Sequence, residues 1–406
     1  MADSAQSLRQ VIRRIEARYV RAEPRPSRRQ ERSLAELVGG SRETTEAGPI
    51  LVATRRFPPD HDHGRFSLGA LLDQPARALG IAAGSPDGEA VPADRLVYLD
   101  TETTGLAGGT GTYAFMVGVG FFERGDFILR QYFMEDLDQE PALIAALAGL
   151  LPRFEGVVTY NGRAFDLPLL ETRFILGRRR WPGDLSHFDL LRPSRSFWKD
   201  ALPDCRLSTI EQEVLGVRRE DDVPGSVIPS LYFSYLRERR PGPMARVFAH
   251  NESDILSLVT LAGWHARAVH DPKALELSPE EWVGLGRIWE RLDWERALDC
   301  HMEAFRGGLP GELKRRLVKR LAYGEKRRGR WEEARRFWEE SIAHEVGFDP
   351  APWEELAKHY EHRSKRYAAA KEVVLTALDR ARDHRAADFI LARLQHRLAR
   401  LERRLR

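Results

Sequence analysis

Two carboxylates lie one residue apart in the segment DTETTGLAGGTGTYAF, residues 100–115. Asp100 ends the apolar run LVYLD (96–100), which predicts a buried strand, and Glu102 follows two positions later. Residues i and i+2 of a strand point to the same side, so both carboxylates are expected at the C-terminal end of this strand, where α/β sheets place their active sites. Two adjacent carboxylates repel each other, and a hard divalent cation such as Mg²⁺ or Mn²⁺ relieves that repulsion. The pair alone is a weak signal, because solvated acids are also common at strand ends.

Three more chemically competent side chains lie in other predicted elements. Asp166 falls in the first turn of the helix expected after the apolar strand GVVTYN (156–161). His250 and Asp254 are one turn apart on one face of a long helix expected over 244–266. Four carboxylates could hold two divalent ions that clamp the attacking and leaving oxygens of a phosphodiester. A neutral histidine could take the proton of the attacking water. The set indicates a metal-dependent phosphodiester hydrolase.

The glycine-rich half of the first segment, GLAGGTGTYAF (105–115), allows a different interpretation as the phosphate-binding loop of a nucleotide-dependent protein. Such a loop needs Lys followed by Ser or Thr after its last glycine, and then a helix. Neither follows here, and a strand is expected instead. We therefore expect a flexible turn, with a nucleotide-cofactor site as the alternative.

The pattern around these residues predicts an α/β domain. The segment 115–134 is expected to form two strands around the turn Arg124-Gly125-Asp126. The elements expected after it are a helix over 141–154, a strand over 156–161, a helix over 164–176, a strand over 185–191 and a short helix over 205–216. This order predicts a mixed five-stranded sheet flanked by helices.

After about residue 275 no further strand is expected, and a repeat begins. Trp294-Glu-Arg-Ala recurs as Trp331-Glu-Glu-Ala and as Tyr367-Ala-Ala-Ala, at intervals of 37 and 36 residues. Each motif follows an apolar helical segment, and the interval is slightly above the 34 residues of a tetratricopeptide repeat. We predict an all-α domain of three stacked units, with an ordinary helical domain as the alternative.

The chain is expected to divide into four parts. Residues 1–48 are interpreted as an amphipathic helix with a linker over 23–48, and 49–95 as an N-terminal extension that includes a strand over 50–57. Residues 96–268 form the expected catalytic domain, and 276–406 the repeats.

The composition fits a cytoplasmic protein. The longest apolar runs are too short to span a bilayer, the first residues lack the apolar core of a signal peptide, and the two cysteines, Cys205 and Cys300, predict no disulfide framework. The net charge is only +3 and the cations are mostly Arg. Arg suits phosphate contacts, but a coding bias explains the same excess.

The motifs DTETTGL (100–106), YNGRAFDLPLL (160–170) and AHNESDILSL (249–258) resemble the three exonuclease motifs of the DEDD, or DnaQ-like, 3′–5′ exonuclease superfamily, which has a ribonuclease H-like fold. The resemblance covers about residues 96–268. It is closest to a bacterial branch, often called YprB-like, that carries tetratricopeptide repeats after the nuclease domain. The segments GGTGTYAF (108–115), HFDLL (187–191) and CRLSTIEQEVLGVRR (205–219) are similar to further features of that branch.

The resemblance implies roles for individual residues. Asp100, Glu102 and Asp254 would ligate one metal ion, and Asp166 would hold a second. His250 would act as the general base or orient the attacking water. It precedes the last aspartate by four residues, the spacing of the tyrosine-type members rather than the five of the histidine-type members. The substrate is expected to contact Thr103, Gly105, Leu106, Asn161 and Phe165.

The function expected from the sequence is a 3′–5′ exonuclease that uses two Mg²⁺ or Mn²⁺ ions. The substrate would be DNA or RNA with a single-stranded 3′ end, and the repeats could bind a protein partner. A structure-specific endonuclease and a non-catalytic nucleic-acid-binding scaffold are the alternatives.

Several other groups allow a functional and a plain interpretation. Asp60-His61-Asp62-His63 has a metal-like composition but also fits a turn, and Asp189 could support the site or be a solvated edge residue. Arg192, Arg195, Trp198 and Lys199 could grip a single strand. Trp264 and His265 are expected to pack beside the repeats, and the basic helix over 391–406 is expected to cap them.

Overall fold

The computed structural model describes residues 32–85, 89–105, 111–182 and 184–406. They form two compact units, which divide between Leu277 and Ser278. The helix predicted around Leu8 to Ile15 lies outside the described residues. None of the helices in the described part of the chain is long and apolar enough to cross a membrane. The predicted cytoplasmic location stays a prediction.

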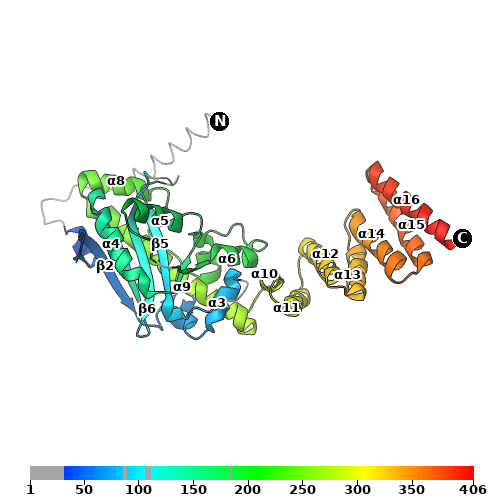
Figure 1. The fold of residues 1–406 in the computed structure, drawn as a ribbon, viewed down its shortest axis with the longest axis horizontal. Coiled ribbons are helices and arrows are strands. Elements are labelled where there is room, and N and C mark those ends of the chain that lie inside the picture. The colour runs from blue at the N-terminus through cyan, green and yellow to red at the C-terminus, as the bar shows by residue number, and fades with distance from the viewer. Residues whose placement is uncertain (1–31, 86–88, 106–110, 183) are drawn as a thin grey trace, which may run out of the picture. The chain divides into compact units, whose positions relative to one another are not determined.

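The first unit is built on a mixed sheet of seven strands (Figure 1). The strand order is β1 (Gly40–Thr45), β2 (Gly48–Phe57), β7 (Asp126–Phe133), β6 (Ala114–Glu123), β5 (Leu96–Thr103), β8 (Gly156–Thr159) and β9 (Ser186–Asp189). β5, β8 and β9 are parallel, and all other neighbours are antiparallel. The five predicted strands from β5 onward form one continuous part of this sheet. The predicted strand over 50–57 also exists as β2, and it joins the same sheet together with β1, so the strand count is seven rather than five.

Part of the predicted linker over 23–48 is regular structure. α2 (Leu34–Val38) begins at a capping box, in which Ser33 and Glu36 each accept a backbone N–H bond from the other residue. β1 follows and pairs with β2. β1 escaped prediction because its sequence, GSRETT, is polar and it lies exposed at the sheet edge.

Helices surround the sheet. They are α3 (Ala76–Ala83), α4 (Glu140–Leu150), α5 (Asp166–Leu176), α6 (Leu191–Trp198), α7 (Leu207–Ile210), α8 (Ile228–Glu238) and α9 (Pro241–His270). The predicted short helix over 205–216 is α7 followed by a π-helical turn, Glu211–Leu215. A separate two-stranded sheet pairs β3 (Asp62–His63) with β4 (Phe66–Ser67).

α9 packs directly on the middle of the sheet because two glycines of β6 leave room for it. A Cβ atom at Gly118 would lie 2.1 Å from Oδ1 of Asn251, and one at Gly120 would lie 2.6 Å from Cγ2 of Ile255. Asp100 pairs with Gly118 across β5 and β6. The side chains of β5 alternate between the two faces, so Asp100 and Glu102 both face α9.

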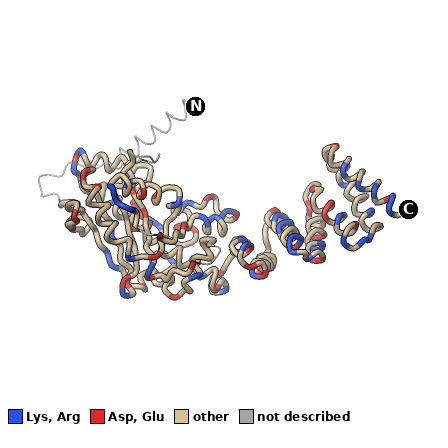
Figure 2. Tube along the Cα trace, viewed as in Figure 1, with Lys and Arg blue, Asp and Glu red and all other residues tan. Residues whose placement is uncertain are grey.

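The second unit is entirely helical. It contains α10 (Pro279–Trp289), α11 (Trp294–Arg306), α12 (Gly311–Arg327), α13 (Trp331–Ala343), α14 (Pro350–Lys358) with a π-helical turn His359–Arg363, α15 (Tyr367–Asp383) and α16 (Asp388–Leu405). Trp294, Trp331 and Tyr367 each begin the second helix of a pair. The all-α prediction is confirmed, and the tetratricopeptide assignment stays a prediction. Lys and Arg are interspersed with Asp and Glu along these helices (Figure 2).

Candidate metal centre

The fold brings the predicted acidic residues to one edge of the sheet. Asp100 and Glu102 lie at the C-terminal end of β5. Asp166 is the first residue of α5, which follows the parallel strand β8. α9, which packs on the sheet, contributes His250 and Asp254 to the same edge. Because β5 and β8 are parallel neighbours, their carboxyl ends meet here.

Three of these side chains present ligand atoms to one another. Nε2 of His250 lies 3.3 Å from Oδ2 of Asp254 and 3.9 Å from Oε1 of Glu102. One ligand atom from each of the three residues lies within 4.8 Å of the others. Among residues 32–85, 89–105, 111–182 and 184–406, no second group of this kind is present. Asp60, His61, Asp62 and His63, considered above as an extra metal site, form no such group in the described part of the chain.

Asp100 and Asp166 are held in place by neutral hydrogen-bond donors. Nδ2 of Asn251 donates to Oδ2 of Asp100 at 2.9 Å. Asn251 is fully buried and accepts a bond from Nε2 of Gln131 on β7 at 3.0 Å. The hydroxyl of Thr101 donates to Oδ1 of Asp166 at 2.5 Å. The sheet and α9 thus fix two carboxylates without neutralising them.

Burial and mutual repulsion make the ionised carboxylates unfavourable. Burial, followed by the charges of Asp254, Asp166 and Glu102, raises the pKa of Asp100 well above its usual range. Burial raises the pKa of Glu102 to about 8 and that of Asp166 to about 6. A cluster of carboxyl groups with raised pKa values at a sheet edge is the donor set that a hard divalent cation stabilises. The residues therefore fit Mg²⁺ or Mn²⁺.

His250 is oriented by a residue that the sequence did not point to. Its Nδ1 lies 2.7 Å from Oδ1 of Asp222, so the carboxylate accepts the Nδ1 proton and Nε2 is directed at Glu102 and Asp254. Burial alone would lower the pKa of His250, but the charge of Asp254 and the bond to Asp222 raise it to about 9. These two partners favour the protonated form of His250.

Arg219 is a second unpredicted member of the site. Its NH2 lies 2.5 Å from Oδ1 of Asp254 and 2.5 Å from Oε1 of Glu211. Its NH1 lies 3.2 Å from Nδ1 of His250 and 3.4 Å from Oδ2 of Asp222. Glu211, the first residue of the π-helical turn, is 1% exposed. Arg219 therefore anchors Asp254 through an ion pair and partly offsets the negative charge of the cluster.

Four of the five predicted substrate-contacting residues are described, and they lie around this edge. Thr103 ends β5 and donates from its hydroxyl to the carbonyl of Gly105 at 2.9 Å. Phe165 is 58% exposed next to Asp166. Asn161 adopts a left-handed conformation with φ of 65°. Leu106 lies outside the described residues.

Asp189 shapes the loop that carries Asn161 and Phe165. Its carboxylate accepts backbone N–H bonds from Asn161 at 2.8 Å, Arg163 at 3.1 Å and Leu191 at 3.0 Å. The plain interpretation of Asp189 as a solvated edge residue is thus wrong. It holds the turn between β8 and α5 and so positions Asp166.

Two other expectations are corrected by the packing. Trp198 is 1% exposed and lies 4.7 Å, between ring centroids, from Trp264, so its face cannot stack on a base. Trp264 and His265, predicted to pack beside the repeats, are buried in the first unit, where they pack on α6. His63 is bonded to Ser257, with 2.8 Å between Nε2 and Oγ, and supports α9.

The order of strands and helices and the acidic edge of β5 define a ribonuclease H-like domain. Residues 97–266 match the sequence model of the RNase_H superfamily. Proteins of this superfamily usually hydrolyse nucleic acids with the help of divalent metal ions, which supports a nuclease in general.

A relative extends over nearly the whole chain. The sequence is 30% identical over 367 residues to "Uncharacterized protein YprB" of Bacillus subtilis (strain 168), which covers 87% of this chain and 86% of the relative. The chain belongs to the YprB family.

Proposed function

We propose that this protein is a 3′–5′ exonuclease that hydrolyses phosphodiester bonds at the acidic edge of its ribonuclease H-like domain. The observation that carries the proposal is the convergence of Asp100, Glu102, Asp166 and Asp254 on one sheet edge, with raised pKa values for the first three. Buried carboxyl groups kept together in this way are costly to a fold and are typical of functional sites.

The four carboxylates would bind two metal ions. Asp100, Glu102 and Asp254 would hold one ion, and Asp166, held by Thr101, would hold a second. Bound there, Mg²⁺ or Mn²⁺ would supply the positive charge that activates water and stabilises the leaving oxygen.

His250 would remove the proton of the attacking water. Asp222 accepts the Nδ1 proton of His250, so the neutral ring has its lone pair on Nε2, the atom directed at Glu102 and Asp254. His250 must first lose the proton that its pKa of about 9 retains in the metal-free site. With a cation held by Glu102 and Asp254, the pKa of His250 would fall and the neutral ring would be favoured.

The strand end is proposed to lie between the end of β5 and the loop before α5. Phe165 is an exposed aromatic ring next to Asp166, and an exposed ring can stack on a base without sequence preference. Thr103, Gly105 and Asn161 provide hydroxyl, backbone and amide groups around it. We propose a single-stranded 3′ end of DNA or RNA as substrate.

A strand-end assay tests the polarity of the reaction. Single-stranded DNA and RNA with a 5′ label, and with a free or chemically blocked 3′ end, would be incubated with the full chain and Mg²⁺ or Mn²⁺. We expect a ladder of products that shortens from the free 3′ end and is absent for the blocked strand. Internal cleavage of the blocked strand would instead establish an endonuclease. Binding without any cleavage would favour a non-catalytic scaffold.

A further inference from the structure

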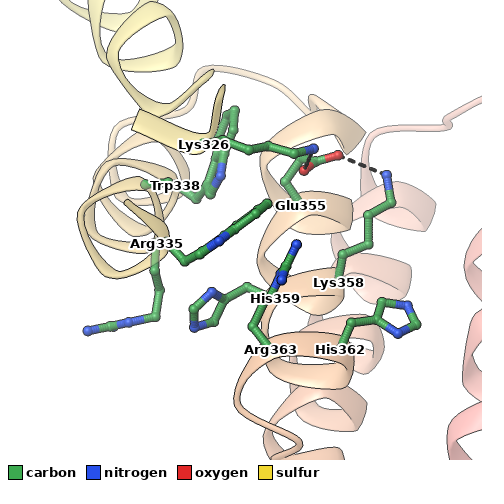
Figure 3. Close-up of a pocket in the computed structure, with 10 residues that line it drawn as sticks. Lys326, Arg335, Trp338, Glu355, Lys358, His359, His362 and Arg363 are labelled. Atoms are coloured by element: carbon green, nitrogen blue, oxygen red, sulfur yellow. Dashed lines mark hydrogen bonds and ion pairs between the residues drawn. The ribbon is translucent and has the colours of Figure 1, made fainter. Parts of the chain in front are cut away.

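A small cavity in the helical unit has a lining rich in cations. It lies between α13 and α14 at the end of α12, and its volume is about 180 Å³ (Figure 3). Four cationic side chains line it against a single carboxylate; they are Lys326, Arg335, Lys358 and Arg363, opposite Glu355. A concave surface with this excess of positive charge concentrates anions.

Much of this charge is already paired, which identifies the cation that is left over. Glu355 bonds both Lys326 and Lys358, as the dashed lines in Figure 3 show. Arg335 pairs with Glu332 and with Glu339, which lie outside the lining.

Arg363 differs from these cations. Within the part of the chain that the structure describes, no acidic side chain pairs with it. Its guanidinium carbon lies 3.8 Å from the centroid of the Trp331 ring. A guanidinium stacked on a ring keeps its N–H edge available, and its planar fork matches two oxygens of a phosphate.

A buried histidine adds a second, independent observation. His359 lines the cavity and is 6% exposed, yet neither ring nitrogen has a hydrogen-bond partner among the described residues. Nε2 lies 3.3 Å from Oε1 of Glu332, an ion pair only when the ring is protonated. Burial lowers the pKa of His359, although the charge of Glu332 opposes that shift, and Nδ1 is left without a partner among the described residues.

The local backbone brings these two groups together. His359 and Arg363 are the first and last residues of a π-helical turn. Such turns are rare and often occur at functional sites. In Figure 3, His359 and Arg363 project from this turn towards the helix that carries Arg335.

We propose that this cavity binds a backbone phosphate of a single-stranded nucleic acid, with Arg363 and His359 as the phosphate contacts. Drug-sized ligands occupy about 300–1,000 Å³, so a cavity of about 180 Å³ suits one phosphate group of a longer ligand. Trp331 offers an aromatic ring beside it, as strand-binding sites do. The choice of nucleic acid over an acidic peptide rests on the proposed function of the same chain.

A second anchor for one strand has a clear consequence. Two sites on one chain that hold the same polymer raise the effective concentration of the strand at each site. The cavity should therefore strengthen the binding of long strands and leave the binding of very short ones unchanged.

Binding measurements on the full chain test this directly. Fluorescence anisotropy of a labelled single-stranded 30-mer would be followed in EDTA, which prevents metal-dependent cleavage, for wild type and Arg363→Gln over a range of salt concentrations. We expect affinity for the 30-mer to fall roughly 2- to 5-fold and the slope of log K against log salt to shrink by about 0.7. Affinity for a trimer should not change. Arg336→Gln, which removes an exposed charge from α13, is the matched control and should change neither quantity.

His359→Gln provides a second variant, and circular dichroism establishes that each variant is folded. The proposal would be overturned if Arg363→Gln and Arg336→Gln lost equal affinity for the 30-mer. It would also be overturned if Arg363→Gln and His359→Gln were folded and bound the 30-mer as tightly as wild type. An Arg363-dependent affinity for a labelled polyglutamate peptide or for a mononucleotide, with no effect on the 30-mer, would overturn it as well. The binding test involves no cleavage, so its outcome is independent of nuclease activity. Failure of the phosphate-binding proposal can therefore be distinguished from failure of the proposed nuclease function.

Discussion

Replacing Glu102 by Gln is expected to stabilise the metal-free chain at neutral pH and to remove most of the stabilisation that a divalent ion gives. Glu102 is 8% exposed, and burial raises its pKa from 4.5 to about 8. Between these two pH values the folded chain keeps a proton that the unfolded chain has lost. The free energy of unfolding therefore falls as the pH rises through this window.

The size of the effect follows from the width of the window. At pH about 7.5 the solution is roughly three units above the unfolded pKa of Glu102, and each unit corresponds to about 1.4 kcal/mol. The free energy of unfolding of wild type is then lowered by at most roughly 4 kcal/mol. Gln does not titrate, so the variant does not lose this stability. At about 2–4 °C per kcal/mol for a domain of this size, the variant should unfold at most roughly 8–16 °C above wild type.

Thermal unfolding from pH about 5 to about 8.5, in EDTA and in Mn²⁺, measures both effects. The difference between the two curves reports the titration of Glu102 together with its charge coupling to Asp100 and His250. We expect that difference to grow with pH and to be smallest at the acid end of this range, close to the unfolded pKa of Glu102. Glu155→Gln removes a carboxyl that is 59% exposed and serves as the control. A difference that does not depend on pH, or equal Mn²⁺ stabilisation of variant and wild type, would refute the reasoning.

Three further outcomes are expected. Asp222→Asn should lower kcat by roughly 10- to 100-fold, because orienting partners of site residues have effects of this size. Mn²⁺ binding, measured by calorimetry, should stay near wild type. An unchanged kcat would show that Asp222 does not orient His250. Gly118→Ala should lower the free energy of unfolding by about 1–3 kcal/mol in urea titrations, because its Cβ would lie 2.1 Å from Oδ1 of Asn251; wild-type stability would contradict the close approach of α9. Removing metal with EDTA from a sample at about 100 times the Kd should cost about 2.7 kcal/mol of stability, seen as a lower Tm in a thermal scan, and no shift would argue against a metal site.

The carboxylates could be predicted because each follows a strong local pattern. LVYLD and GVVTYN are apolar strands with a polar end, and the helical spacing of His250 and Asp254 is visible in the sequence alone. Parallel pairing of β5 and β8 then places the strand ends together. The positions of Asp100, Glu102 and Asp166 at this edge needed no tertiary information beyond the order of elements.

The residues that support the site could not be predicted in this way. Arg219 is one of many arginines, and it contacts Asp254 35 residues further along the chain. Gln131 reaches Asn251 across 120 residues. Such contacts depend on how α9 lies on the sheet. The local sequence gives only one hint of that packing, the glycines at positions 118 and 120 in an otherwise apolar strand.

Contacts between residues distant in sequence also explain the wrong expectations for Trp198 and β1. Trp198 follows several basic residues and resembles part of a strand-binding surface, but the ring is buried by residues of α9, more than sixty positions away. The polar strand β1 is stabilised by its neighbour β2 and by pairs such as Arg42 with Glu135, 2.6 Å apart, rather than by an apolar face of its own. In both cases the contact partner decides the structure, and it is not adjacent in sequence.

Dependence of strand cleavage on the acidic edge is the most direct test of the account. Wild type, Asp100→Asn and the matched control Asp138→Asn, which changes an exposed acid outside the site, would be compared under single-turnover conditions with Mn²⁺ and a labelled single strand. We predict cleavage by wild type and Asp138→Asn, and a loss of at least roughly 100-fold in Asp100→Asn, the scale of removing a principal electrostatic group from an active site. Equal cleavage by all three proteins would show that the activity does not arise at this edge, and the central claim would be wrong.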